Sequence, residues 1–113
     1  MQLDAISLFP EMFDAVTRFG VSRRAIEQSI WQFAAWNPRD FAQNAYRTVD
    51  DRPYGGGPGM VMMAEPLAKA IAAARQRQKS TGVARPRVIH LTPQGRLLNH
   101  EVVMELAGQQ GLV

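Results

Sequence analysis

The length, composition and charge of the chain limit it to one small domain, or to part of one. It has 113 residues, of which 46% are hydrophobic, and a formal net charge of +3, which allows a single core of modest size. It has no cysteine, which excludes disulfides and thiolate chemistry. The start, MQLDAISLFPEMF, lacks the pattern of a secretory signal, and no apolar run could span a bilayer. We therefore expect a cytoplasmic protein without membrane contact.

The first forty residues predict two strands and two helices. The apolar run from Leu3 to Leu8 predicts a buried strand. Pro10 then opens a helix whose apolar residues recur at helical spacing until Gly20 ends it. Ser22 is a candidate cap for a second short helix, and the aromatic run from Trp31 to Trp36 predicts a second strand.

A long glycine-rich loop follows and is the first candidate site. Between residues 39 and 59 no helical or strand period persists, and the segment closes with DDRPYGGGPG. Glycines let a backbone approach a flat ligand or a phosphate closely, and Asp50, Asp51 and Arg52 add charge at the loop's entry. The segment is neither a Walker A loop nor a dinucleotide fingerprint, because the required lysine and third glycine are missing. A flexible connector is the alternative.

The second half predicts helix, strand, helix and the start of another strand. Glu65-Pro66 opens a helix with an apolar face, and the polar stretch 75–85 ends it. Residues 87–91 predict a clear strand, and Asn99 is a candidate cap for the last helix. Strands that alternate with helices predict an α/β fold with a largely parallel sheet flanked by helices. Because residues 111–113 resemble the start of a strand, we expect the chain to be truncated.

Seven cations between residues 66 and 100 have no carboxylate among them. Such a set predicts a surface that faces a polyanion, and a solvated helix end is the alternative. The seven are Lys69, Arg75, Arg77, Lys79, Arg85, Arg87 and Arg96.

The turn after the expected strand 87–91 is the second candidate site. It reads HLTPQGR from His90 to Arg96. Ligands of open α/β sheets bind beyond the carboxyl ends of strands, so the backbone of this turn could hold an adenosine-like group. An ordinary strand-to-helix turn is the alternative. His90 and His100 lack matching ligands, so we expect no metal site.

Four stretches of the sequence resemble the bacterial tRNA (guanine-N1)-methyltransferase family. They are MQLDAISLFPEMF, NPRDF from Asn37, RTVDDRPYGGGPGM from Arg47 and LTPQGR from Leu91. They run over the whole chain in the family's order, and the long middle motif is highly specific. The resemblance implies that residues 1–113 are the N-terminal portion of a SPOUT methyltransferase domain whose trefoil knot is incomplete in this chain. It also implies a homodimer with active sites at the subunit interface.

The resemblance further implies a reaction and its site residues. Family members transfer a methyl group from S-adenosylmethionine to N1 of the tRNA guanosine just 3′ of the anticodon. The family comparison assigns the first cofactor-contacting loop to His90, Leu91, Thr92 and Pro93. It assigns the loop that approaches the target guanine to Asp50, Asp51, Arg52, Pro53, Tyr54, Gly55, Gly56, Gly57, Pro58 and Gly59, with Asp50 and Gly59 as the first candidates for base contacts.

Catalysis in the family needs residues that this chain does not supply. Guanine N1 loses its proton as it attacks the methyl sulfonium, so a positioned carboxylate base is required. In the family that aspartate, a partner arginine and the remaining cofactor loops lie beyond position 113. No catalytic residue is therefore assigned here, and we expect the 113 residues alone to be inactive and to bind cofactor weakly. Family enzymes use magnesium, for which no residue marks a site. The alternative is a non-catalytic module that binds RNA or dimerises.

Overall fold

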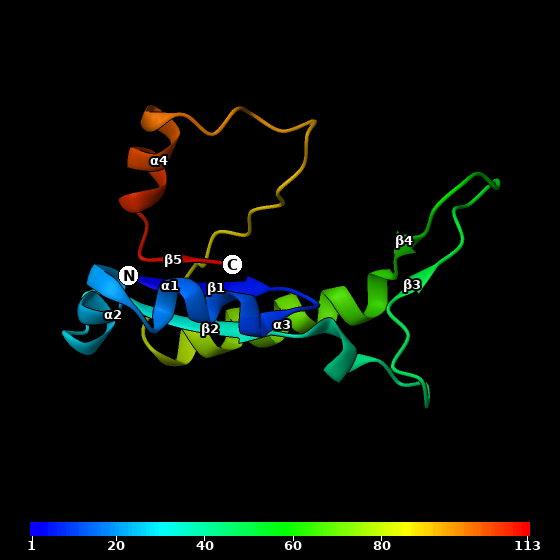
Figure 1. Cartoon of the computed structure of the whole chain (residues 1–113), viewed down its shortest axis with the longest axis horizontal. Coiled ribbons are helices and arrows are strands. Elements are labelled where there is room, and N and C mark those ends of the chain that lie inside the picture. Colours follow the sequence, from blue (N-terminus) through cyan, green and yellow to red (C-terminus); the bar gives the residue numbers. More distant parts are fainter.

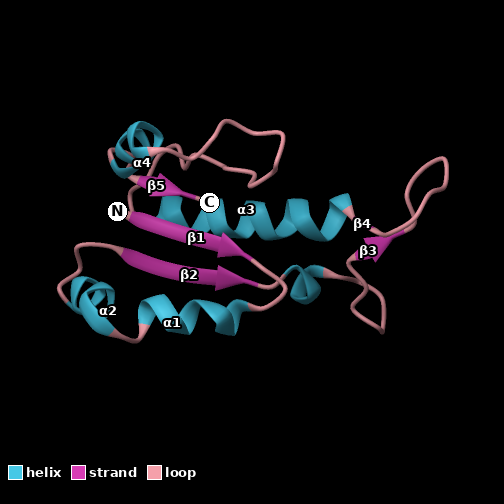
Figure 2. Cartoon of the chain, turned by 45° about the horizontal axis from the view of Figure 1, so that its top comes forward, coloured by secondary structure: helices cyan, strands magenta, loops and turns pink.

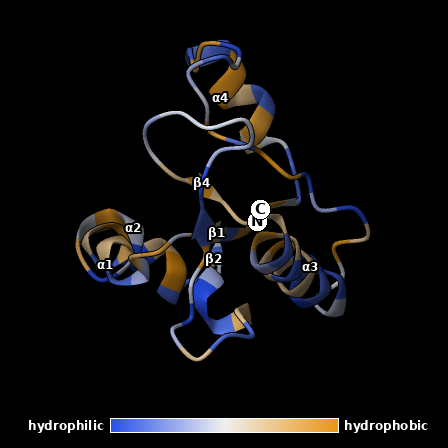
Figure 3. Ribbon diagram, turned by 90° about the vertical axis from the view of Figure 1, so that its right-hand side faces the viewer, coloured by the Kyte–Doolittle hydropathy of each residue, from blue (hydrophilic) through white to orange (hydrophobic).

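The computed structural model describes all residues, 1–113, as a small parallel sheet with helices on both faces (Figures 1 and 2). Helices α1 and α2 lie on one side of β1 and β2, and α3 lies on the other (Figure 3). The predicted α/β architecture is confirmed. In chain order the elements are β1 (Gln2–Ile6), the 3-10 helix η1 (Pro10–Phe13), α1 (Asp14–Thr17), α2 (Gly20–Glu27), β2 (Gln32–Trp36), the 3-10 helix η2 (Pro38–Phe41), β3 (Asp50–Asp51), β4 (Val61–Met62), α3 (Ala64–Ser80), α4 (His100–Ala107) and β5 (Gly111–Leu112).

The main sheet has the order β2-β1-β5, with all strands parallel. Strand β1 pairs with β2 over its whole length, but β5 pairs only with Gln2 and Leu3. The strand predicted at residues 87–91 is reduced to an isolated bridge. Its hydrogen bonds to β5 end where the Ile89 N–H donates to the Val113 carbonyl at 2.8 Å. Residues 90 and 91 make no backbone hydrogen bond to another strand.

The prediction for the start of α2 is wrong, whereas the prediction for the end of α3 is confirmed. Ser22 does not cap α2: it lies inside the helix, and its hydroxyl donates to the Phe19 carbonyl at 3.2 Å. The helix begins instead at Gly20, whose φ of +64° is a conformation that glycine adopts without strain. Helix α3 continues through the first half of the polar stretch 75–85 and ends at Ser80. The polar stretch stays helical because Gln78 continues the buried stripe of Pro66, Ala70 and Ala74 at four-residue spacing.

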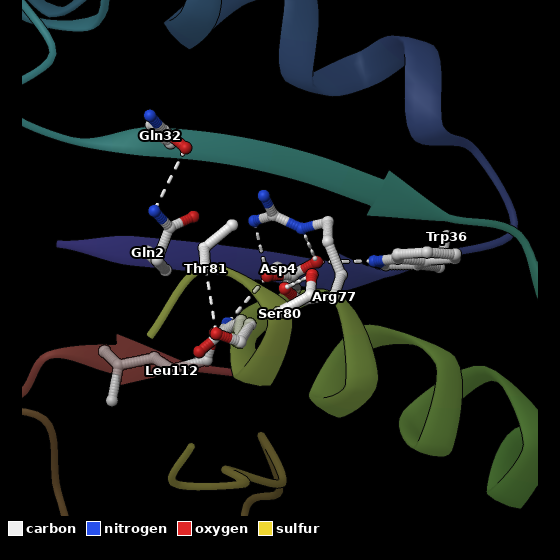
Figure 4. Close-up of polar contacts among 9 residues, drawn as sticks. Gln2, Asp4, Gln32, Trp36, Arg77, Ser80, Thr81 and Leu112 are labelled. Carbon is white, nitrogen blue, oxygen red and sulfur yellow. Dashed lines mark hydrogen bonds and ion pairs between the residues drawn. The ribbon is translucent and has the colours of Figure 1, made fainter. Parts of the chain in front are cut away.

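A buried polar cluster joins the sheet to α3 (Figure 4). The Asp4 carboxylate accepts hydrogen bonds from Trp36 Nε1 at 2.6 Å, from both ends of the Arg77 guanidinium at 2.8 and 2.7 Å, and from Gln78 Nε2 at 2.6 Å. Gln78 Nε2 also donates to the Leu112 carbonyl at 2.7 Å. The cluster therefore ties β1, β2 and β5 to the same two residues of α3.

Candidate functional site

The glycine-rich loop forms a hairpin that stands away from the sheet, next to the start of α3 (Figure 1). Its base is the antiparallel pair β3–β4, in which Asp50 lies opposite Met62. Val49, which is 1% exposed, anchors this base, and its carbonyl accepts from Met63 N–H at 2.7 Å. Beyond the base the hairpin is exposed, and Tyr54 projects fully into solvent. The hairpin is therefore attached to the rest of the chain at its base only.

The glycines of this hairpin serve its backbone conformation. Gly55, Gly56, Gly57 and Gly59 have φ angles of +80°, +83°, +120° and +88°, a region that other residues rarely adopt. No atom of this chain lies within 4 Å of the position that a Cβ would take at any of them. The surface beside the four glycines is therefore free to accept a ligand.

The second candidate site is a tight turn on the wall of a cavity. Thr92 forms the turn: its carbonyl accepts from Gly95 N–H at 3.0 Å and its hydroxyl from Gln94 N–H at 3.3 Å. All four predicted cofactor-contacting residues line one cavity of about 660 Å³. They are His90, Leu91, Thr92 and Pro93.

The opposite wall of this cavity is helix α4. Asn99 caps the helix, as predicted, by accepting from Val102 N–H at 3.0 Å. Val102 and Leu106 then face the cavity. Half of the lining residues are hydrophobic, and the others are polar residues, a glycine and a proline. The turn forms one side of the cavity, and apolar side chains of α4 form the other.

A second cavity, of about 630 Å³, runs along the uncovered edge of β1. It reaches from Met62 in β4 to Val113, and His90 and Leu91 border it too. No residue of the 50–59 loop lines either cavity. Within this chain, the predicted cofactor residues therefore share one cavity, and the predicted guanine loop lies outside it.

The predicted polyanion surface is smaller than the sequence indicates. Four of the seven cations have carboxylate partners from elsewhere in the chain: the ion pairs are Lys69–Glu65, Arg77–Asp4, Arg87–Glu105 and Arg96–Glu105. The other three of the seven, Arg75, Lys79 and Arg85, are exposed and have no ion pair. Glu65 lies four residues before Lys69 on the same helix, whereas a charge count along the sequence misses the other partners because only folding brings them close.

Glu105 is the residue at this site that the sequence did not reveal. It lies in α4 and pairs with Arg87 Nη1 at 2.6 Å and with Arg96 Nη2 at 2.5 Å. Hydrogen bonds from Arg87 and then from Arg96 hold the pKa of its carboxyl below the usual value of a glutamate. Separations of 18 and 9 residues give no periodic signal that could have predicted the two contacts.

The structure has neither a candidate metal site nor a membrane-spanning helix. No group of three or more histidines, aspartates or glutamates is placed to hold a metal ion. None of the helices combines the length and apolar character needed to cross a membrane.

The parallel sheet, the cavity beyond its edge and the exposed hairpin have a close structural counterpart. The crystal structure of the tRNA (m1G37) methyltransferase from Aquifex aeolicus superposes with a TM-score of 0.82 at 27% identity, over 99% of this chain and 48% of that one. The fold is thus that of part of a SPOUT methyltransferase domain, as expected. The family model of tRNA (Guanine-1)-methyltransferase TrmD matches residues 1–113, and the chain belongs to that family.

Curated relatives agree with this assignment. A tRNA (guanine-N(1)-)-methyltransferase of Methylobacillus flagellatus is 65% identical over 112 residues, which are 99% of this chain and 42% of the relative. That of Chromobacterium violaceum is 58% identical over 113 residues, which are 100% of this chain and 44% of the relative. The chain thus spans less than half the length of these relatives.

Proposed function

We propose that the chain is the N-terminal portion of a tRNA (guanine-N1)-methyltransferase and carries its guanine loop and its first cofactor loop. The observation that carries the proposal is the convergence of His90, Leu91, Thr92 and Pro93 on one cavity of about 660 Å³. This volume is within the range of about 300–1,000 Å³ that small-molecule sites occupy. The full protein would methylate N1 of the guanosine just 3′ of the anticodon.

The lining of the cavity suits S-adenosylmethionine, which supplies the methyl group as an electrophilic sulfonium. Leu91, Leu98 and Leu106 offer apolar surface to a flat adenine. Backbone N–H and C=O groups of the 90–93 turn can read its polar edge, as they do in other sites beyond parallel strands. Thr92 keeps the turn closed through the hydrogen bond to its hydroxyl.

The hairpin would present its open glycine face to the target guanine. Asp50 and Gly59, at the two ends of the loop, are proposed to contact the base, and the exposed cations of the domain would face the tRNA backbone. Since the hairpin and the cavity are apart in one chain, a homodimer could bring the hairpin of one subunit to the cofactor of the other. The homodimer implied by the family is part of the proposal.

No residue of the described site is proposed as the base that deprotonates guanine N1. Asp50 is exposed on the hairpin, and the Asp51 carboxylate accepts from Arg52 N–H at 2.7 Å. Neither lines the cavity. We therefore propose that the 113 residues alone bind cofactor weakly and transfer no methyl group.

The binding claim is tested by nuclear magnetic resonance titration of the chain with S-adenosylmethionine up to about 1 mM, where weak ligands first saturate. We expect amide shifts confined to residues 90–96 and to the cavity face of α4, and none with ATP as the control nucleotide. Shifts elsewhere, or no shifts, would overturn the assignment of the cavity.

A second assay with labelled S-adenosylmethionine and unmodified tRNA should detect no transfer, and robust transfer would refute the inactivity of the chain.

The second candidate function is a non-catalytic RNA-binding module. The observation in its favour is the set of three exposed cations without an ion pair at and beyond the end of α3, Arg75, Lys79 and Arg85. A chain that binds tRNA at low salt and shows no response to S-adenosylmethionine would support this reading in place of the first.

A further inference from the structure

One carboxylate of α4 is bonded to both ends of the predicted cofactor loop. Arg87 precedes the loop and bonds to Glu105 Oε1, and Arg96 follows the turn and bonds to Glu105 Oε2. Each carboxylate oxygen thus serves one arginine. A carboxylate with two cationic donors forms stronger hydrogen bonds than a neutral acceptor does.

The rest of the loop has little else to hold it. Past Ile89 the pairing with β5 ends, and the hydrogen bonds made by Thr92 stay within the turn. The bond from Arg96 to Glu105 is the only hydrogen bond that connects residues 90–98 to another part of the chain. Without it the turn would depend on exposed apolar side chains alone, since residues 90–98 are all exposed.

The helix that carries Glu105 leads directly into the sheet. Asn99 caps its first turn, Val102 is buried, and β5 follows directly and pairs with β1. Glu105 also lies one helical turn after Val102 and beside Leu106, two residues that line the cavity. The carboxylate therefore joins the loop wall of the cavity to the helix wall.

We propose that Glu105 is a positioning residue that sets the conformation of the 88–96 loop, and with it the shape of the cavity, by holding Arg87 and Arg96 at once. The proposal rests on the proposed function insofar as it assigns residues 90–93 to the cofactor. It does not make Glu105 catalytic, because Glu105 does not line the cavity.

The test compares Glu105→Gln with Glu101→Gln in the same chain. Glu101 is exposed on the same helix, and no ion pair involves it, so the control makes the same charge change without loss of a contact. Hydrogen exchange of the amides of residues 88–96 is measured by mass spectrometry. In Glu105→Gln we expect the amides of residues 88–96 to exchange about three- to ten-fold faster, because two partly exposed ion pairs are lost. Exchange should be unchanged in Glu101→Gln, and the amides of α3 should be unchanged in both variants.

Two results would overturn the proposal: unchanged loop exchange in Glu105→Gln, or faster exchange spread evenly over the whole chain. If Glu105→Gln does not fold, Arg96→Gln removes one arm only, and exchange should then rise near Arg96 more than near Arg87. The affinity for S-adenosylmethionine should fall by a similar factor in Glu105→Gln. A chain that binds no S-adenosylmethionine but shows the local change in exchange would contradict the proposed function and leave the role of Glu105 standing.

Discussion

Asp4 and Gly111 lie on neighbouring strands, and both contact the side chain of Gln78. The carboxylate of Asp4 is 3% exposed and accepts four hydrogen bonds, so its burial is compensated by donors from three residues. The other side of Gln78 faces Gly111, and its Oε1 has no hydrogen-bond partner. The interior thus depends on the hydrogen-bonded carboxylate of Asp4 and on the absence of a side chain at Gly111.

Substitution of Asp4 by Asn should strongly destabilise the chain. The amide would turn one acceptor oxygen into a donor that points at other donors, and Arg77 would lose its counter-charge. Breaking such a buried pair costs about 3–5 kcal/mol. Urea unfolding followed by circular dichroism measures the free energy of unfolding. Asp14→Asn, in the exposed pair with Arg18, is the control and should change it by less than about 1 kcal/mol. Equal losses in the two variants would contradict the account.

Substitution of Gly111 by Ala should also destabilise the chain. The new Cβ would lie 1.9 Å from Gln78 Oε1 and 2.9 Å from a methyl group of Val83, and the two hydrogen bonds of Gln78 prevent it from moving freely. Overpacking of this kind costs about 1–3 kcal/mol. Gly108→Ala is the matched control because its φ is −76° and its nearest contact is at 3.6 Å. A melting temperature lowered equally by both substitutions would refute the steric explanation.

The elements around the cavity differ in how they are held. Helix α4 has a capped first turn and leads into a paired strand, whereas the 88–96 loop is held by Glu105. The sequence predicted the helix, its cap and the turn, since these depend on neighbouring residues. It could not predict that the strand at 87–91 would form only a bridge, because strand pairing depends on a partner that is distant in sequence.

The hydrogen bonds from Arg87 and Arg96 to Glu105 should weaken in acid. The folded pKa of Glu105 is lowered by Arg87 and Arg96, the charged groups that face it. A lowered pKa means that the stabilisation is complete above the ordinary carboxyl pKa and is lost as the pH falls through the lowered folded value. The carbon-13 signal of the Glu105 carboxyl should therefore titrate below the ordinary range of a glutamate, and Arg87→Gln should raise its midpoint. A Glu105 midpoint that is unchanged by Arg87→Gln would contradict this.

The whole molecule has a small core for its length. Only 12 of 113 residues are buried, and the radius of gyration is 15.8 Å, against about 13 Å for a compact domain of this size. The sequence predicted an apolar face for the first helical segment. One residue of that face, Phe13, packs against Phe33 with the two ring centroids 5.1 Å apart. Met12, Val16 and Phe19, from the same spacing, stay 72%, 50% and 66% exposed. An exposed set of this kind indicates a surface that another molecule covers.

We predict that a second copy of the chain covers this surface, in keeping with the proposed homodimer. Phe19→Ser should weaken self-association without loss of fold, because the side chain has few contacts within the chain to lose. Sedimentation velocity over a range of protein concentrations measures the effect. Tyr46→Ser, at a site that is 91% exposed on a different segment, should leave association unchanged. A wild-type chain that stays monomeric at every concentration would refute the prediction.

The sequence by itself determined the α/β order of elements, the capped last helix, the two candidate loops and the family. These follow from local periodicity, turn chemistry and motifs, which are properties of neighbouring residues. Only the tertiary structure decided which cations remain free, how Asp4, Arg77 and Gln78 connect the sheet to α3, and that Glu105 bonds both ends of the cofactor loop. Each of these contacts joins residues far apart in sequence, and only the packing of strands and helices brings their side chains within hydrogen-bonding distance.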